Sequence, residues 1–247
     1  FNARVASWIN IYRGHPEKIK EYFKKIQWDK MGTRQNFNLI VTLFRCSAHE
    51  LSKDIYPRFK FAEMTNAEKI ELLKLLYDYM REGAMAKNFF NQIRLGEMTD
   101  PAKSGLANYL WRKDEMLVFQ CYAAMRNQEY ADYCRLQYFH FRKDPKRGIV
   151  SAKKVVSVPD YAKDAWTKLA DFYEMTKEWK NAINALRQAD SPPGTLFRIA
   201  RNYERLSSIS QAVAQLKEIE NFFRNQRASA AMEIAYVYSR AKKKKKE

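Results

Sequence analysis

The 247-residue chain has the composition of a folded protein, with 46% hydrophobic and 30% charged residues, which excludes global disorder. Its 7 glycines and 7 prolines are too few for an all-β or loop-rich fold, whereas residues that favour helices are abundant. A formal net charge of +17 favours anionic partners, namely nucleic acid, an acidic protein face or a phospholipid surface.

Cysteine usage and hydropathy bear on the compartment. The three cysteines, Cys46, Cys121 and Cys134, form no CxxC pair. We expect buried thiols of a reduced protein, which favours a reducing, cytoplasmic compartment. No run approaches the ~18 apolar residues of a membrane-spanning helix, so we expect no membrane span. Because the chain begins with Phe1 and not with Met, we also expect it to be a fragment or a processed product of something larger.

Apolar residues at helical spacing predict a series of short helices in the N-terminal half. The ranges, in chain order, are 2–13, 16–26, 35–53, 65–81, 84–95, 99–111 and 115–126. Thr65 and Glu68 have the spacing of a capping box, and Asp114 is placed to cap the last of these helices. These helical pairs over 1–128 follow no repeat consensus. They therefore fit degenerate repeats, HEAT-like hairpins or a small bundle.

The C-terminal half contains one clear helical hairpin, between Trp166 and Gly194. Large and small apolar residues alternate at offsets that let two antiparallel helices approach closely. In the first helix these residues are Trp166, Leu169, Ala170 and Tyr173. In the second helix they are Ala182, Leu186 and Ala189, and Pro192 and Pro193 then end the hairpin.

The same pattern recurs along the chain. A second copy has Leu196, Ile199, Ala200 and Tyr203 followed by Ala212, Leu216 and Ile219, and a third begins with Ala231, Ile234, Ala235 and Tyr238. Backwards, helices at 130–142 and 146–156 form a looser copy that ends at Pro159, about one ~34-residue period before Pro193. The spacing resembles the tetratricopeptide repeat (TPR), W-x2-L-G-x2-Y then A-x3-F, over residues 130–241, with Ala170 and Leu186 replacing the family's glycine and phenylalanine.

This resemblance implies an all-α fold, a right-handed α-solenoid of antiparallel helical hairpins. We expect N-terminal hairpins over 1–128, TPR-like repeats over 129–241 and a basic tail over 242–247 that is disordered or truncated. No polar capping helix follows Ala241, which favours truncation.

We find no pattern of catalytic or cofactor-binding residues. Gly-rich phosphate loops and GxSxG elbows are absent from the sequence. Cys46 and His49 stand three residues apart, but no further ligands are near, so no metal site is expected. The chain is accordingly predicted to be no enzyme and to need no cofactor.

Two basic surfaces are candidates for partner binding. The first lies on the expected concave face, which takes peptides or helices in such arrays. Its members are Lys168, Arg198, Arg201 and Arg205. A carboxylate clamp of the TPR type is not supported, because Thr167 and Asp171 stand where its Lys and Asn would be.

The second basic surface is a cluster next to aromatic residues, a combination that suits single-stranded nucleic acid. Its members are Arg142, Lys143, Lys146, Arg147, Lys153 and Lys154. The aromatics Tyr133, Tyr138 and Phe139 precede it, but at the spacing of core positions.

We therefore favour a non-catalytic scaffold that binds another protein, through an acidic segment, on its concave face. One alternative is an RNA- or DNA-binding helical-repeat protein that uses the basic cluster at 142–154. Another is the helical-repeat arm of a larger enzyme. The sequence indicates nothing about the oligomeric state.

Overall fold

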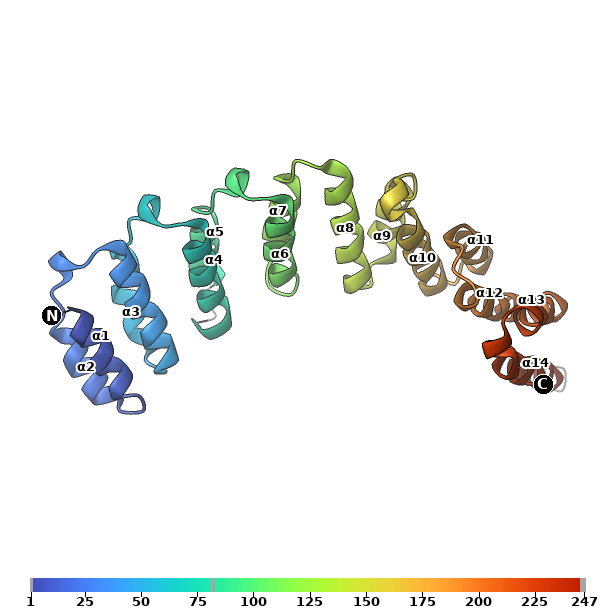
Figure 1. Ribbon diagram of the computed structural model, residues 1–247, viewed down its shortest axis with the longest axis horizontal. Coiled ribbons are helices and arrows are strands. Elements are labelled where there is room, and N and C mark those ends of the chain that lie inside the picture. The colour runs from blue at the N-terminus through green and yellow to red at the C-terminus, as the bar shows by residue number, and fades with distance from the viewer. Residues whose placement is uncertain (1, 81–82, 245–247) are drawn as a thin grey trace. The chain divides into compact units, whose positions relative to one another are not determined.

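The computed structural model describes residues 2–80 and 83–244, and within that part the chain is all-helical, without a β-strand (Figure 1). This confirms the predicted all-α class. The chain divides into two compact units, Phe1–Ala124 and Met125–Glu247, which we describe separately. The sequence predicts a change in the type of repeat after residue 128. The division into compact units does not test the type of repeat, so this boundary stays a prediction.

The first unit consists of short α-helices, with 3-10 helix in some of the connections between them. Its α-helices are α1 (Asn2–Ile11), α2 (Pro16–Lys24), α3 (Thr33–Arg45), α4 (Asn66–Leu75), α5 (Gly83–Phe90), α6 (Asp100–Leu110) and α7 (Glu115–Ala123). The connections α2–α3, α3–α4 and α5–α6 contain 3-10 helix. A π-helical turn, Leu76–Met80, extends α4. Helix packing is mainly between neighbours in sequence, for example α1 with α2, α4 with α5, and α6 with α7.

The helix predicted over 35–53 is shorter than expected. Ser47 adopts a left-handed backbone conformation, with φ of 59°, and the N–H of Ala48 donates to the carbonyl of Leu43 at 2.9 Å. This 6→1 hydrogen bond closes a Schellman turn, which ends α3 at Arg45. A separate 3-10 helix, His49–Asp54, follows. The apolar residues keep a helical spacing across this turn, so hydrophobic spacing alone does not show that the helix ends there.

A repeat that the sequence patterns did not reveal is present in the first unit. Three 3-10 helices in this unit are each followed by a methionine, and the methionine is followed by the residue that caps the next helix. These 3-10 helices are Trp28–Lys30, Phe61–Glu63 and Leu95–Glu97. Their spacing is about 34 residues. Four residues beyond the caps Gly32, Thr65 and Thr99, the buried polar side chains of Asn36, Lys69 and Lys103 occupy equivalent positions.

A capping box and the buried Lys103 stabilise these hairpins. The predicted capping box is confirmed: Thr65 Oγ1 accepts from the N–H of Glu68 at 3.2 Å, and Glu68 Oε2 accepts from the N–H of Thr65 at 2.9 Å. Lys103 is fully buried, and its Nζ donates to Asp100 at 3.1 Å and to the carbonyl of Ala124, at the end of α7, at 2.7 Å. The lysine thus joins the start of one helix to the end of its partner.

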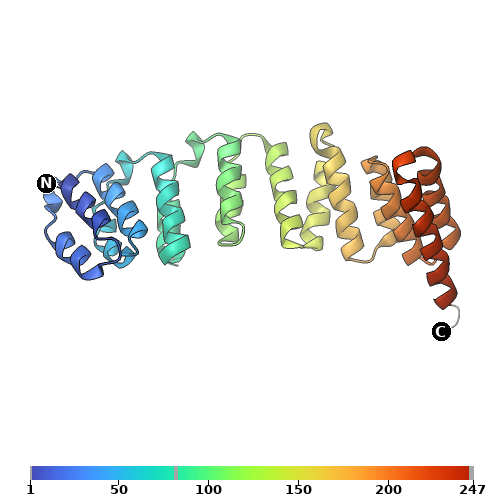
Figure 2. The same cartoon turned by 60° about the horizontal axis from the view of Figure 1, so that its bottom comes forward.

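The second unit is a series of longer helices. They are α8 (Gln128–Arg142), α9 (Pro145–Val155), α10 (Pro159–Met175), α11 (Trp179–Ala189), α12 (Gly194–Arg205), α13 (Ile209–Phe222) and α14 (Arg227–Lys244). Each packs against the next, and Figure 2 shows them following one another side by side. The first helix of the hairpin expected from Trp166 begins earlier than predicted. Pro159, expected to end the preceding helix, is the first residue of α10. This sequential packing is consistent with a helical repeat.

One tight turn recurs inside the hairpins of the second unit. Lys143, Lys177 and Ser207 all have left-handed backbone conformations, with φ of 52°, 62° and 59°. In each case the next residue donates a 6→1 hydrogen bond to the preceding helix, at 2.8 to 3.0 Å. Because Ser47 makes the same turn in the first unit, this hairpin geometry occurs in both halves of the chain.

The packing residues predicted for the hairpin at 166–194 are confirmed in their burial. Leu169, Ala170 and Tyr173 are buried on α10, and Ala182, Leu186 and Ala189 are buried on α11, while Trp166 is half-buried. In the next copy Ile199, Ala200, Ala212, Leu216 and Ile219 are buried as well.

The register predicted for the third copy is wrong. On α14 the buried residues are Ala230 and Val237, with Ile234 half-buried, whereas Ala231, Ala235 and Tyr238 are exposed. The reason is that α14 packs against α13 through the first of these faces, and no helix follows it among the described residues. The segment expected as a basic tail begins inside α14, and residues 245–247 lie outside the described part.

Candidate nucleic-acid or peptide interface

A surface groove of about 480 Å³ lies between α8 and α9 in the second unit. We call it the α8–α9 groove. Its walls carry basic side chains and its floor is mostly apolar. It is lined by Asp132, Arg135, Phe139, Lys146, Arg147, Val150, Ser151 and Lys154.

The α9 side of the groove is a single stripe of the helix. Lys146, Val150 and Lys154 follow at intervals of four residues, so they lie one above another on the same face. Asp144 fixes where the helix begins by accepting a hydrogen bond from the N–H of Arg147 at 3.2 Å, with Pro145 as first residue. Val150 is 60% exposed. The stripe therefore offers a cation, an apolar group and a second cation to solvent.

The α8 side supplies Phe139 and Arg135, and both arginines of the groove, Arg135 on α8 and Arg147 on α9, are already paired. Phe139 is buried, with the Arg147 guanidinium 5.0 Å above its ring centroid. Arg147 Nε also donates to Asp144 Oδ2 at 2.6 Å, and Arg135 donates to Asp132 at 2.5 Å. Partial burial raises the pKa of Asp144, but the hydrogen bonds and charge of Arg147 outweigh this and hold it below its usual value. Both arginines are thus held in place by carboxylates.

Lys146 and Lys154 differ from these arginines. Both are exposed, and neither ammonium forms an ion pair within the part of the chain that the structure describes. They are the cations of the α8–α9 groove that are available to an external anion.

The predicted nucleic-acid cluster is only partly brought together by the fold. Lys146, Arg147 and Lys154 line the groove. Lys143 is the left-handed residue of the turn, Arg142 is the exposed last residue of α8, and Lys153 is exposed one position away from the Lys154 stripe. Three of the six residues therefore share one surface feature.

The predicted concave-face row is not a row of free cations. Arg198 Nη2 donates to Asp171 Oδ1 at 2.5 Å and to Glu174 Oε2 at 2.9 Å, and its side chain is 25% exposed. Burial lowers the pKa of the Arg198 guanidinium, but its bonds with the two carboxylates outweigh this and raise it. The sequence prediction overlooked that α10 presents two carboxylates, three residues apart, to the same face of α12.

This ion-pair network continues on both sides of Arg198. His140 Nε2 on α8 lies 2.8 Å from Asp171 Oδ2, and Asn202 Nδ2 donates to Glu174 Oε1 at 2.9 Å. Further along, Arg240 on α14 donates to Glu204 on α12 at 2.6 Å. The first helices of successive hairpins, α8, α10, α12 and α14, are therefore joined by contacts between polar and charged side chains.

The other predicted members of the row differ in their freedom. Lys168 Nζ lies 2.8 Å from Asp164, and its side chain is only 12% exposed. Arg201 is 66% exposed and approaches Glu233 only to 3.8 Å, and Arg205 is exposed. Arg201 and Arg205 remain the solvent-facing cations of the four.

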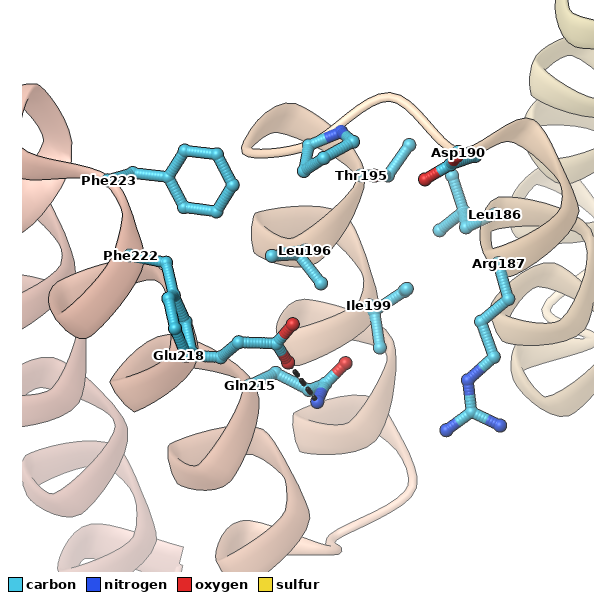
Figure 3. A pocket seen from close by; sticks show the side chains of 11 residues that line it. Leu186, Arg187, Asp190, Thr195, Leu196, Ile199, Gln215, Glu218, Phe222 and Phe223 are labelled. Atoms are coloured by element: carbon cyan, nitrogen blue, oxygen red, sulfur yellow. Dashed lines mark hydrogen bonds between the residues drawn. The ribbon is translucent and has the colours of Figure 1, made fainter.

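A second pocket, of about 420 Å³, lies among α11, α12 and α13 (Figure 3). Leu196 and Ile199 form its apolar wall, and Phe222, which is 77% exposed, faces Arg187 across the opening (Figure 3). Arg187 donates to the hydroxyl of Tyr203 at 2.8 Å, and Gln215 donates to Glu218 at 3.3 Å. Its charges are of both signs, so its lining favours no single class of ligand. The sequence patterns did not predict this pocket. The adjacent Phe222 and Phe223 were the one sequence feature that could have indicated an apolar surface there.

Among the described residues, no group of three or more His, Cys, Asp or Glu side chains could hold a metal ion. The side chain of His49, considered with Cys46 from sequence, lies outside the described part. The three cysteines are buried, as predicted, and none of them forms a disulfide. Within the described ranges, no helix has the length and apolar character needed to cross a membrane. No protein-family model matches the chain, and a search of curated proteins finds no match for it.

Proposed function

We propose that the chain is a non-catalytic helical-repeat protein that binds an acidic segment of another protein, and that the α8–α9 groove is the binding site. The observation that carries this is the pair Lys146 and Lys154, two unpaired cations on either side of the exposed Val150. Charge complementarity of this kind steers an anionic partner and fixes its position.

We further propose that the second unit is a right-handed α-solenoid of the TPR type. Support comes from the left-handed turn residues Lys143 and Lys177, which are separated by about 34 residues, the period of that repeat. The buried Ala170 and Ala182 at the crossing of α10 and α11 add to it. Arg201 and Arg205 on α12 then belong to the concave face and offer a secondary contact for the same partner.

The position of the cations in α9 favours a functional role for them. Lys146 and Arg147 lie in the first turn of the helix, which contains no acidic residue. The helix dipole disfavours positive charge at that end by about 0.3–1 kcal/mol for each residue. The pairing with Asp144 offsets this cost for Arg147, but Lys146 has no ion pair among the described residues, so stability does not explain the lysine there, whereas binding of an anion does.

An acidic peptide fits the groove better than single-stranded nucleic acid does. Binding of bases relies on open aromatic faces. In the groove Phe139 is buried beneath Arg147, and nearby Tyr133 stacks on Tyr161 with centroids 4.3 Å apart. No ring in the described lining of the groove is thus free to stack on a base, while the apolar floor suits an aliphatic side chain.

The test compares two labelled probes, a hexaglutamate peptide and a single-stranded oligodeoxythymidine of similar length, titrated by fluorescence anisotropy with the full chain. We expect the peptide to bind at about 50 mM salt and to bind more weakly as ionic strength rises, because exposed ion pairs are screened. Reversing two charges, Lys146→Glu with Lys154→Glu, should lower the affinity about tenfold, since each pair contributes about 0.2–1 kcal/mol and the new carboxylates repel the probe.

The matched control is Lys180→Glu with Lys217→Glu, which changes the net charge equally at exposed lysines of α11 and α13. It should retain the affinity. If both double variants lose binding equally, the effect is one of net charge and the groove is not the site. If the oligonucleotide binds tightly and the peptide does not, the nucleic-acid alternative replaces the present proposal.

A further inference from the structure

We propose that the α8–α9 groove selects an extended acidic segment in which one apolar residue stands between two acidic positions about four residues apart. This inference rests on the proposed function and specifies the partner's sequence. The relevant features are the separation of the two free lysines, the exposed valine between them, and the pairing of the neighbouring arginines.

The separation of Lys146 and Lys154 sets the spacing of the acidic positions. Eight residues of α-helix at 1.5 Å each place their backbones about 12 Å apart. An extended peptide advances about 3.3 Å per residue, so two carboxylates matched to these lysines are about four residues apart. A helical ligand needs the acidic positions about eight residues apart and is about 10–12 Å across. The groove, with one exposed apolar residue on α9, suits the extended segment.

Val150 provides the apolar contact between the two cations. It is 60% exposed, and it lies midway along the stripe, four residues from each lysine. The buried Phe139 lines the same groove, and Ser151 Oγ donates to the carbonyl of Asp132 at 3.4 Å, which satisfies both polar groups. An aliphatic side chain placed there covers Val150 and leaves no buried polar atom of the floor unpaired.

The paired arginines contribute shape and selectivity. Arg135 and Arg147 are held by Asp132 and Asp144, so their guanidinium groups stay in place along the walls. A basic residue at either acidic position would meet Lys146 or Lys154 with no free carboxylate to offset the repulsion. The groove therefore distinguishes acidic–apolar–acidic segments from basic ones.

Three labelled peptides test this inference on the full chain. The first is Glu-Glu-Ser-Leu-Ser-Glu-Glu, the second replaces its leucine with serine, and the third places all four glutamates before Ser-Leu-Ser. We expect the first to bind about tenfold more tightly than the second, as expected for partial burial of a leucine side chain. The third should bind more weakly than the first, because when its four consecutive glutamates span the two lysines no apolar side chain is left between them to contact Val150.

The protein variant Val150→Ser identifies the contact. Val150 is exposed, so the helices should still form, which circular dichroism can verify. We expect this variant to bind the leucine and serine peptides equally, at the affinity that the wild type has for the serine peptide.

Two results overturn the inference while the proposed function survives: equal binding of the leucine and serine peptides by the wild type, or binding of the third peptide as tight as that of the first, in each case with the charge-reversal variant impaired. A different result, with no peptide bound at about 50 mM salt, overturns the proposed function and this inference together.

Discussion

Gly148 on α9 lies so close to Phe172 on α10 that a β-carbon at Gly148 would stand 2.2 Å from Cζ of the ring. Phe172 is fully buried and cannot move aside without displacing the core. The glycine therefore allows α9 and α10 to pack at this distance, and it holds the helix that carries Lys146 and Lys154 against the rest of the second unit.

We expect Gly148→Ala to lower the free energy of unfolding by about 1–3 kcal/mol, because the added methyl group overpacks the contact. Urea denaturation followed by circular dichroism measures the change. Gly105→Ala is the control: Gly105 is an exposed residue of α6, and apart from its chain neighbours and the backbone of its own helix no atom lies within 4 Å of the β-carbon position. That substitution should stabilise by about 0.5–1 kcal/mol. Equal effects at the two glycines would contradict the close contact.

Arg198 should matter for stability more than for binding. Arg198→Ala leaves Asp171 and Glu174 without their guanidinium partner in a half-buried network. We expect a loss of about 1–3 kcal/mol, below the range for fully buried pairs because about a quarter of each side chain is exposed. The exposed Arg205→Ala on the same helix should change the free energy of unfolding by less than about 0.5 kcal/mol.

Binding data on the same two variants separate stability from recognition. Arg198→Ala should leave the affinity of the α8–α9 groove for an acidic peptide unchanged at temperatures where the variant is folded. A strong loss of affinity, with stability preserved, would show that Arg198 contacts the partner directly.

Two tyrosines make stability sensitive to alkaline pH. Burial, assisted by the charge of a nearby aspartate, raises the pKa of Tyr77 and of Tyr133 to about 12, from 10.0. Because the folded state has the higher pKa, it favours the neutral phenol. This contribution is complete below pH 10 and is lost as the pH rises from about 10 to about 12.

Urea denaturation across that range should therefore show falling stability, and the Tyr133→Phe variant should show a smaller decrease than the wild type. The absorbance of tyrosinate provides an independent readout in the native protein. If Tyr133→Phe and wild type lose stability in parallel, burial of Tyr133 is not the cause.

The helices of the second unit were largely predictable because their apolar residues recur at a spacing that only a helical hairpin satisfies. Ala170 and Ala182, for instance, are small where α10 and α11 approach, and both are fully buried. The pattern misled on α14, where the same spacing describes the exposed Ala231 and Ala235. Spacing identifies an apolar face, but which face is covered depends on the helices that are present.

The repeat in the first unit had a sequence signal of a different kind. Met64-Thr65 and Met98-Thr99 each end a 3-10 turn and cap a helix, and buried lysines follow at Lys69 and Lys103. A search for large and small apolar residues does not detect polar positions, although buried polar residues at equal spacing are informative because each needs a specific partner. Burial lowers the pKa of the Lys69 ammonium, because the charged form is less well solvated at this buried position.

The candidate site depended on information that the sequence does not contain. The basic residues at 142–154 were apparent from composition, but the groove requires α8 and α9 to be placed so that Phe139 and Val150 line one surface. Similarly, nothing local to Arg198 indicates that Asp171 and Glu174, one hairpin earlier, neutralise it. Contacts between successive repeats decide which cations are free.

Lysine footprinting tests the location of the binding site most directly. The full chain is acetylated with a water-soluble ester, with and without saturating Glu-Glu-Ser-Leu-Ser-Glu-Glu peptide, and the modified lysines are quantified by mass spectrometry. We expect Lys146 and Lys154 to be protected several-fold by the peptide, while the exposed Lys177 and Lys217 react at unchanged rates. Uniform protection of all four lysines, or protection that leaves Lys146 and Lys154 as reactive as before, would contradict binding in the α8–α9 groove.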